Sequence, residues 1–243
     1  MPLRLAVLIS LVLLAATSAS SAADMSFSLV PVGGPDKCDN GCPLAIVAQG
    51  EITNDTPEQF TAFVAANRSP DMLSVVYLDS LGGKVVSSMA LGQSFRRLGV
   101  AAIVGWPVDG DGTKLAPGRC FSACVYALIG AKQRVIPPQS AVGIHRMFSY
   151  DSTTDPAGGT VRTIHHDDGG MRELIAQYSS EMGVSRGLID AAEQTSSDSI
   201  YVLSPAEISR WRLGASRMSL DEPAKMRRHG KRAGSSKPAL AKR

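Results

Sequence analysis

Residues 119–147 constrain this chain most, because they predict a buried helix that is framed by short strands. Within this stretch, Ser122 lies where a Gly/Pro-rich loop gives way to an apolar run of helical length, which ends at Gly130. A short strand at residues 142–144 then leads directly to His145. A hydroxyl at a helix start and an imidazole at a strand end are the two groups that an activated serine needs.

Strands and helices alternate ahead of this stretch. The strands are short and mostly apolar, which is typical of parallel strands that are buried on both faces. Thr56 as an N-cap before a proline indicates a helix start, and Gly99 after an amphipathic run indicates a helix end. This order predicts an α/β fold with right-handed crossovers and a mostly parallel sheet. In chain order we expect a strand at 44–52, a helix from Thr56, a strand at 73–78, a helix at 85–98 and a strand at 100–104.

The first 23 residues have the features of a secretory signal peptide. Arg4 provides the positive charge, residues 5–16 form the apolar run, and small residues lead to a cleavage site near Ala23. A retained membrane anchor is the alternative, but the run is shorter than the roughly 20 residues that a bilayer-spanning helix requires. We therefore expect export across the inner membrane into the periplasm, and no stable membrane anchor.

Composition divides the remainder of the chain. Residues 24–43 are expected to be an irregular lead-in, residues 44–215 a folded domain, and residues 216–243 a disordered basic tail. Because the net charge of +3 arises mainly from the tail, the folded domain is close to neutral. That balance argues against a nucleic-acid-binding surface. Residues 150–159 are polar and glycine-containing, and they predict a flexible insertion before a helix at 170–182.

The four cysteines, Cys38, Cys42, Cys120 and Cys124, are disulfide candidates if the chain is exported. Four cysteines allow three pairings. We favour the two local pairs, and a bridge from the N-terminal loop to the serine segment is the main alternative. Zinc is disfavoured because neither Cys-x₃-Cys pair has a well-placed histidine. The His-His-Asp-Asp run at 165–168 is interpreted as a solvated loop, since adjacent side chains diverge. No metal and no cofactor is expected.

Three segments in order resemble the proteolytic subunit of the Clp protease (ClpP) and its crotonase-like relatives. They are the strand and Gly-Gly turn at 75–85, the serine-to-histidine stretch at 119–147, and the Leu-Ser-Pro-Ala-Glu segment at 203–207 with Leu213 and Gly214. The resemblance covers about residues 44–215. It implies a ClpP/crotonase-like spiral of repeated β-β-α units with a mostly parallel sheet, and self-association into a homo-oligomer.

The resemblance also implies roles for individual residues. Ser122 would be the nucleophile and His145 its base, with the backbone N–H groups of Gly83 and Ala123 as the oxyanion hole. Leu81 stands where the family usually has proline. The third catalytic residue of the family is an aspartate several residues before the Leu-Ser step, and in this sequence Ser196 occupies that position. Asp198 is therefore our candidate for this role, and Asp190 is a more distant one.

Two functions of different classes follow. The first is an exported serine hydrolase, a peptidase that acts on peptide or protein substrates. The second is a catalytically inactive binding or assembly module on the same scaffold, which the missing aspartate favours. Acyl-CoA chemistry fits poorly with export, and a Ser/Lys pair using Lys84 or Lys132 matches the pattern less well than His145 does.

Overall fold

The main sheet is seen in a computed structural model, which describes residues 23–33, 42–108, 114–155, 158–167 and 169–215. Residues 1–22 of the signal segment, the basic tail and Cys38 all lie outside the described residues. The sheet runs in the order β1–β2–β3–β4–β5, with β7 also paired to β4. Pairings β2–β3, β3–β4 and β4–β7 are parallel, so the predicted α/β fold with a mostly parallel sheet is confirmed. The strands are β1 (Ser26–Pro31), β2 (Leu44–Gln49), β3 (Met72–Asp79), β4 (Ala101–Pro107), β5 (Leu115–Pro117) and β7 (Gln133–Val135).

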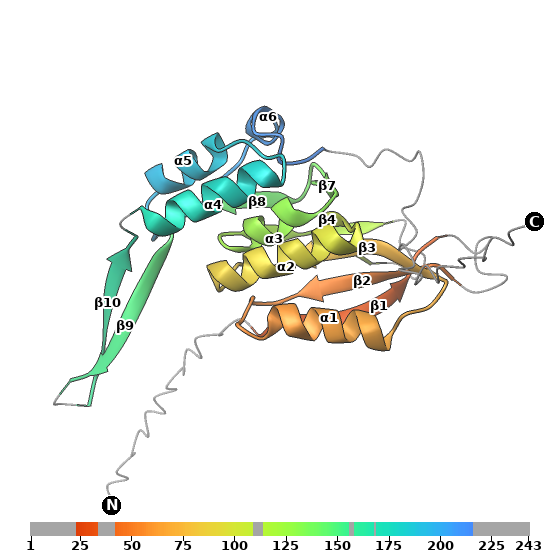
Figure 1. Ribbon diagram of the computed structural model, residues 1–243, viewed down its shortest axis with the longest axis horizontal. Coiled ribbons are helices and arrows are strands. Elements are labelled where there is room, and N and C mark those ends of the chain that lie inside the picture. Colours follow the sequence, from red (N-terminus) through yellow and green to blue (C-terminus); the bar gives the residue numbers. More distant parts are fainter. Residues whose placement is uncertain (1–22, 34–41, 109–113, 156–157, 168, 216–243) are drawn as a thin grey trace, which may run out of the picture.

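Both faces of this sheet are buried, as its apolar strands predicted. Val76 and Leu78 of β3 face the main core, whereas Val75 and Tyr77 belong to a second apolar cluster. The alternation follows from the two-residue period of a strand. Figure 1 shows the helices α1 (Thr56–Ala66), α2 (Val85–Leu98) and α3 (Cys124–Gly130) lying along the sheet.

Helices α2 and α3 pack backbone to backbone through two glycines. A Cβ atom on Gly130 would lie 2.1 Å from the carbonyl oxygen of Gly92, so neither position accepts a side chain without displacing a helix. Every residue of α3 is buried. Helix α2 ends at Gly99, whose φ of 71° is the left-handed C-cap that the sequence predicts. The start of α1 differs slightly from the prediction, because Asp55 is the N-cap and Thr56 is the first helical residue.

A smaller sheet of three strands lies beside the main one. It comprises β6 (Arg119–Phe121), β8 (Ala141–Ile144) and β11 (Tyr201–Val202) in the order β11–β8–β6. Strands β6 and β8 are parallel, and β11 is antiparallel to β8. The helices α4 (Gly170–Glu181), α5 (Gly187–Gln194) and α6 (Pro205–Arg210) gather at this end of the molecule (Figure 1).

Two segments that were expected to be irregular form strands. Residues 26–31 of the lead-in form β1, which pairs antiparallel with β2 and extends the main sheet. The expected flexible insertion is a hairpin of β9 (Phe148–Thr154) and β10 (Thr160–His166), which projects away from the body (Figure 1). Among the residues that the structure describes, no helix has both the length and the apolar character to cross a bilayer.

Candidate active site

Ser122 occupies a sharp turn between β6 and α3. Its φ of 55° is in the left-handed region, which costs a non-glycine residue roughly 1–2 kcal/mol. Hydrogen bonds fix the strand side of the turn, because the Ser122 N–H donates to the Gly143 carbonyl at 2.9 Å and the Phe121 N–H to the Ser80 carbonyl at 3.0 Å. The hydroxyl is therefore held at the point where β6 ends. Backbone strain of this kind is often found at functional sites.

His145 follows β8, the strand next to β6, and the structure brings it to the serine. The parallel register sets Phe121 opposite Gly143, so the residues after both strands emerge side by side. The Ser122 Oγ lies 2.6 Å from the His145 Nε2, within hydrogen-bond distance. Burial lowers the pKa of His145, with the backbone of Arg146 acting in the opposite direction. The ring is thus neutral near pH 7, and the tautomer with its proton on Nδ1 accepts the serine hydroxyl at Nε2.

Among the described residues, no carboxylate reaches the far side of this ring. The His145 Nδ1 is buried, and no side chain in that part of the protein forms a hydrogen bond with it. Asp198, the candidate third residue, is exposed and its carboxylate accepts a hydrogen bond from the Ser196 hydroxyl, which lowers its pKa. Asp190 is paired with Arg172 at 2.5 Å. The structure therefore does not place Asp198 or Asp190 against the histidine, and the geometry is that of a serine–histidine pair.

The Gly82-Gly83 turn lies directly against the serine turn. A Cβ atom on Gly82 would be 2.8 Å from the Cβ of Ser122 and 3.1 Å from the Ala123 nitrogen. Gly83 itself has a φ of 132° and is held by hydrogen bonds of its neighbours to Ile52. In the described part of the chain, neither the Gly83 N–H nor the Ala123 N–H has an acceptor. Two free backbone donors thus accompany the hydroxyl, which is the composition of an oxyanion hole.

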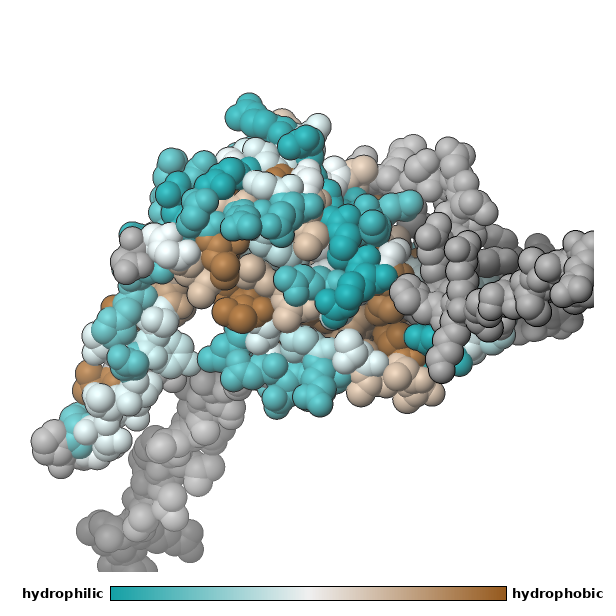
Figure 2. Space-filling view, in the orientation of Figure 1, coloured by the Kyte–Doolittle hydropathy of each residue, from teal (hydrophilic) through white to brown (hydrophobic). Residues whose placement is uncertain are grey.

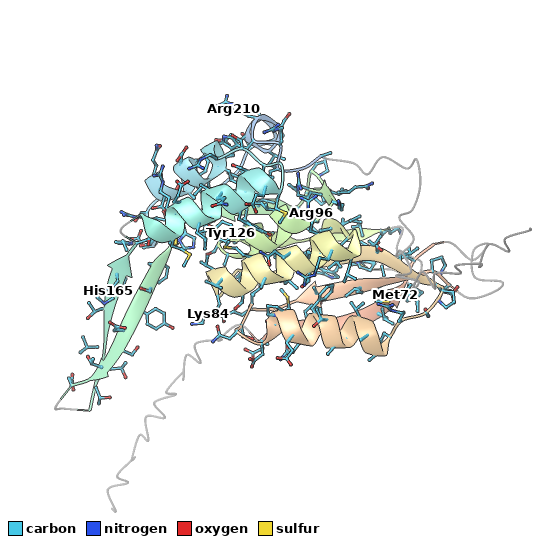
Figure 3. All side chains as sticks on the ribbon, in the orientation of Figure 1. Met72, Lys84, Arg96, Tyr126, His165 and Arg210 are labelled. Carbon is cyan, nitrogen blue, oxygen red and sulfur yellow. A yellow bond between two sulfur atoms is a disulfide. The ribbon has the colours of Figure 1, made fainter. Side chains whose placement is uncertain are left out.

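These groups line a cleft of about 530 Å³. A second hollow of about 590 Å³ shares part of its wall, including Gly83, Lys84 and Phe148, so the two are adjacent, and together they are called the groove. Figure 2 shows the surface hollowed between the hairpin and the body, and Figure 3 shows Lys84 on the hairpin side of α2. The wall of the 530 Å³ cleft includes Glu51, Lys84, Tyr126, Met147, Phe148 and Tyr150. Apart from Lys84, which was weighed as part of a Ser/Lys pair, sequence reasoning missed these side chains of the groove wall.

One wall residue carried a signal in the sequence. Tyr126 lies four residues after Ser122, in the first turn of α3, and it lines the same cleft. Burial, and then the charge of Glu193, raises the pKa of Tyr126 well above its usual range. Its hydroxyl therefore keeps its proton at neutral pH.

The cysteine pairing bears directly on the serine turn. Cys120 and Cys124 form a disulfide, one of the two local pairs that we favoured, and this excludes a bridge from the N-terminal loop to the serine segment. Cys42 is also disulfide-bonded. The described residues contain no cluster of three potential metal ligands, and His165, expected in a loop, lies in β10 and pairs with Asp151 at 3.1 Å.

The comparisons find likeness in solved structures only. No family model matches the chain, and no curated protein matches it. A mutant of the 1510-N membrane-bound stomatin-specific protease is 16% identical, with a TM-score of 0.46 over 69% of this chain and 76% of that one. A second mutant, in complex with a substrate peptide, is 16% identical, with a TM-score of 0.45 over 72% and 74%. ClpP1 from Listeria monocytogenes is 19% identical, with a TM-score of 0.44 over 70% and 88%. This likeness concerns the arrangement of helices and strands, and the roles of Ser122 and His145 have to be argued from this chain's own geometry.

Proposed function

We propose that this chain is a serine hydrolase that cleaves peptides, with Ser122 as the nucleophile and His145 as the general base. The observation that carries the proposal is the 2.6 Å contact between the Ser122 Oγ and the His145 Nε2. A serine hydroxyl is a weak nucleophile until a neighbouring base takes its proton. The half-buried, neutral imidazole is such a base, and it lines the cleft of about 530 Å³.

The reaction follows from the groups present. His145 takes the hydroxyl proton as the Ser122 oxygen attacks the carbonyl carbon of the substrate, and the N–H groups of Gly83 and Ala123 bind the oxygen that becomes negative. The imidazolium then donates its proton to the leaving nitrogen, which departs and leaves an acyl group on Ser122. Water, activated by the same imidazole, releases the acid and restores the hydroxyl.

The groove favours an extended peptide as the substrate. Three consecutive residues of β9, Phe148, Ser149 and Tyr150, line the cleft. Because successive side chains of a strand point to opposite faces, such a run lines a cleft only where the edge of the strand borders it. Within the described residues β9 pairs only with β10, so its other edge offers backbone groups to a substrate.

Two measurements test this function. We expect a fluorophosphonate probe to label the wild-type protein and the control variant Ser199→Ala, whose serine lies outside the cleft, and not to label Ser122→Ala. A fluorogenic peptide library should show turnover with the same dependence on Ser122. Equal labelling and equal turnover of wild type and Ser122→Ala would refute the proposal.

A catalytically silent binding module is the second candidate, and it is favoured because no carboxylate of the described residues bonds to the His145 Nδ1. A carboxylate at that nitrogen normally holds the tautomer and stabilises the imidazolium. If this candidate is correct, peptides bind to the wild-type protein in calorimetry without being cleaved. A measurable wild-type rate that is abolished in His145→Ala excludes it.

We also propose that the chain is exported to the periplasm and self-associates. Export is supported by the signal-like composition of residues 1–23, and self-association by the resemblance of the sequence to ring-forming proteins. Cell fractionation tests the first proposal, and light scattering on the purified protein tests the second.

A further inference from the structure

We propose that the Cys120–Cys124 disulfide positions the nucleophile. Its main effect would be to fix the conformation of the serine turn, and not to stabilise the fold as a whole. This inference rests on the proposed hydrolase function. The two cysteines stand two residues before and two residues after Ser122, and their bond closes a small ring around it. Ser122 and Ala123, which carry the hydroxyl and one of the oxyanion donors, both lie inside that ring.

The serine turn needs support from outside its own backbone. Ser122 is in the left-handed region, which residues other than glycine avoid. The helix that follows has only seven residues, and its N-cap, Ala123, provides no side-chain hydrogen bond. Helices of this length do not hold together by themselves. Besides the disulfide, the local support for the bent conformation is the hydrogen bond from the Val125 N–H to the Ser122 carbonyl at 3.1 Å. The bonds to Gly143 and Ser80 anchor only the strand side of the turn.

Each sulfur is attached to a fixed part of the fold. Cys120 lies in β6, opposite Val142 of β8. Its backbone also forms an isolated parallel β-bridge with Ser80, which directly follows β3. Cys124 is the first residue of the wholly buried α3. Both cysteines have no exposed surface. The bond thus joins the first turn of the helix to a strand that is in register with the strand before His145.

The size of the ring separates a local role from a global one. A disulfide stabilises a fold mainly by restricting the unfolded chain, and that effect is smallest for short loops. By this relation a bond between residues four apart contributes about 2 kcal/mol to global stability, less than the roughly 3 kcal/mol of a 15-residue loop, while it restricts the residues inside the ring strongly. Its effect falls on the distance between Oγ and Nε2 and on the direction of the Ala123 N–H.

The first experiment compares two double variants of the full chain. In Cys120→Ala/Cys124→Ala we expect kcat for a peptide substrate to fall about 10²-fold, the loss that a displacement of about 1 Å causes, while KM changes little. The matched control, Cys38→Ala/Cys42→Ala, removes the remaining two cysteines. Cys42 lies before the start of β2, whereas Glu51, which lines the cleft, follows the end of that strand. We expect this control to keep the wild-type kcat.

A second measurement needs no turnover. In protein labelled with ¹⁵N-histidine, the His145 signal is assigned by its absence from His145→Asn. We expect its Nε2 shift in Cys120→Ala/Cys124→Ala to move to the value seen in Ser122→Ala, which lacks the hydrogen bond. If the wild-type protein proves inactive, the hydrolase proposal fails, while this spectrum still decides whether the disulfide positions Ser122.

Three outcomes overturn the proposal. The first is a double alanine variant that keeps both the wild-type kcat and the wild-type His145 shift. The second is a loss of kcat of the same size in the control variant. The third is unfolding, seen by circular dichroism, of both the double alanine variant and the closer-sized Cys120→Ser/Cys124→Ser, because the bond would then serve the whole fold.

Discussion

Replacing Gly82 with alanine inserts a methyl group between the Gly-Gly turn and the serine turn. The new Cβ would lie 2.8 Å from the Cβ of Ser122 and 2.9 Å from the carbonyl oxygen of Phe121, both closer than real Cβ contacts allow. Gly82 also has a φ of 114°, which alanine rarely adopts. The substitution therefore has two effects: it strains the backbone at position 82, and it displaces the turn that carries Ser122.

The two costs can be separated with a matched glycine. Gly169 also has a φ of 114°, but no atom of the described residues lies within 4 Å of its added Cβ. For Gly169→Ala we expect only the backbone cost, about 1–2 kcal/mol of unfolding free energy. For Gly82→Ala we expect about 2–5 kcal/mol, because the overlap with the serine turn adds about 1–3 kcal/mol.

Urea denaturation followed by circular dichroism measures both unfolding free energies, and the rate of fluorophosphonate labelling reports the position of the hydroxyl. We expect Gly82→Ala to slow labelling about 10²-fold, since a displacement of about 1 Å has that effect. Gly169→Ala should label at the wild-type rate. The reasoning is refuted if the two variants are equally stable and label equally fast.

Three further predictions concern single side chains. When kcat/KM is measured against pH, its acid limb should have an apparent pKa below about 6.5, the ordinary histidine value. Burial lowers the pKa of His145, and only the neutral ring takes the serine proton. A midpoint above about 6.5 would contradict the assignment of His145 as the base. Asp198→Asn should leave kcat/KM unchanged, because this carboxylate binds Ser196 and not the imidazole, and a large loss in a peptide assay would show otherwise. Arg134→Met should lower the unfolding free energy measured by urea denaturation by about 2–4 kcal/mol, because the guanidinium donates to four backbone carbonyls. Arg210 is exposed, so Arg210→Met should change this free energy by less than about 0.5 kcal/mol.

Much of the sheet and of the catalytic pair could be predicted because local signals and tertiary packing agree there. The apolar strands, the left-handed cap at Gly99 and the buried run after Ser122 each specify one local structure, and each is buried where the pattern implies. The approach of Ser122 to His145 follows from the parallel register of two adjacent strands. Sequence shows that both residues flank short strands, but the pairing of those strands is a property of the folded chain.

The hairpin and the third catalytic position were harder to predict for different reasons. Residues 148–166 are polar and contain glycines, so their composition indicates a loop, although Phe148 and Tyr150 have the two-residue spacing of a strand. That weak pattern is realised because β9 and β10 pair with each other. Asp198 was chosen by its distance along the chain, which does not determine where a carboxylate in a polar turn points. In the structure it bonds within its own turn.

The separation between the catalytic pair and the hairpin has an evolutionary consequence. Ser122 and His145 both depend on the β6–β8 pairing, whereas the hairpin that borders the groove begins only at Phe148. Insertions, deletions and substitutions between the hairpin ends can therefore accumulate without altering the register of β6 and β8. Divergence among descendants of this chain should concentrate in the hairpin and change what the groove accepts, while the Ser122–His145 contact is inherited intact.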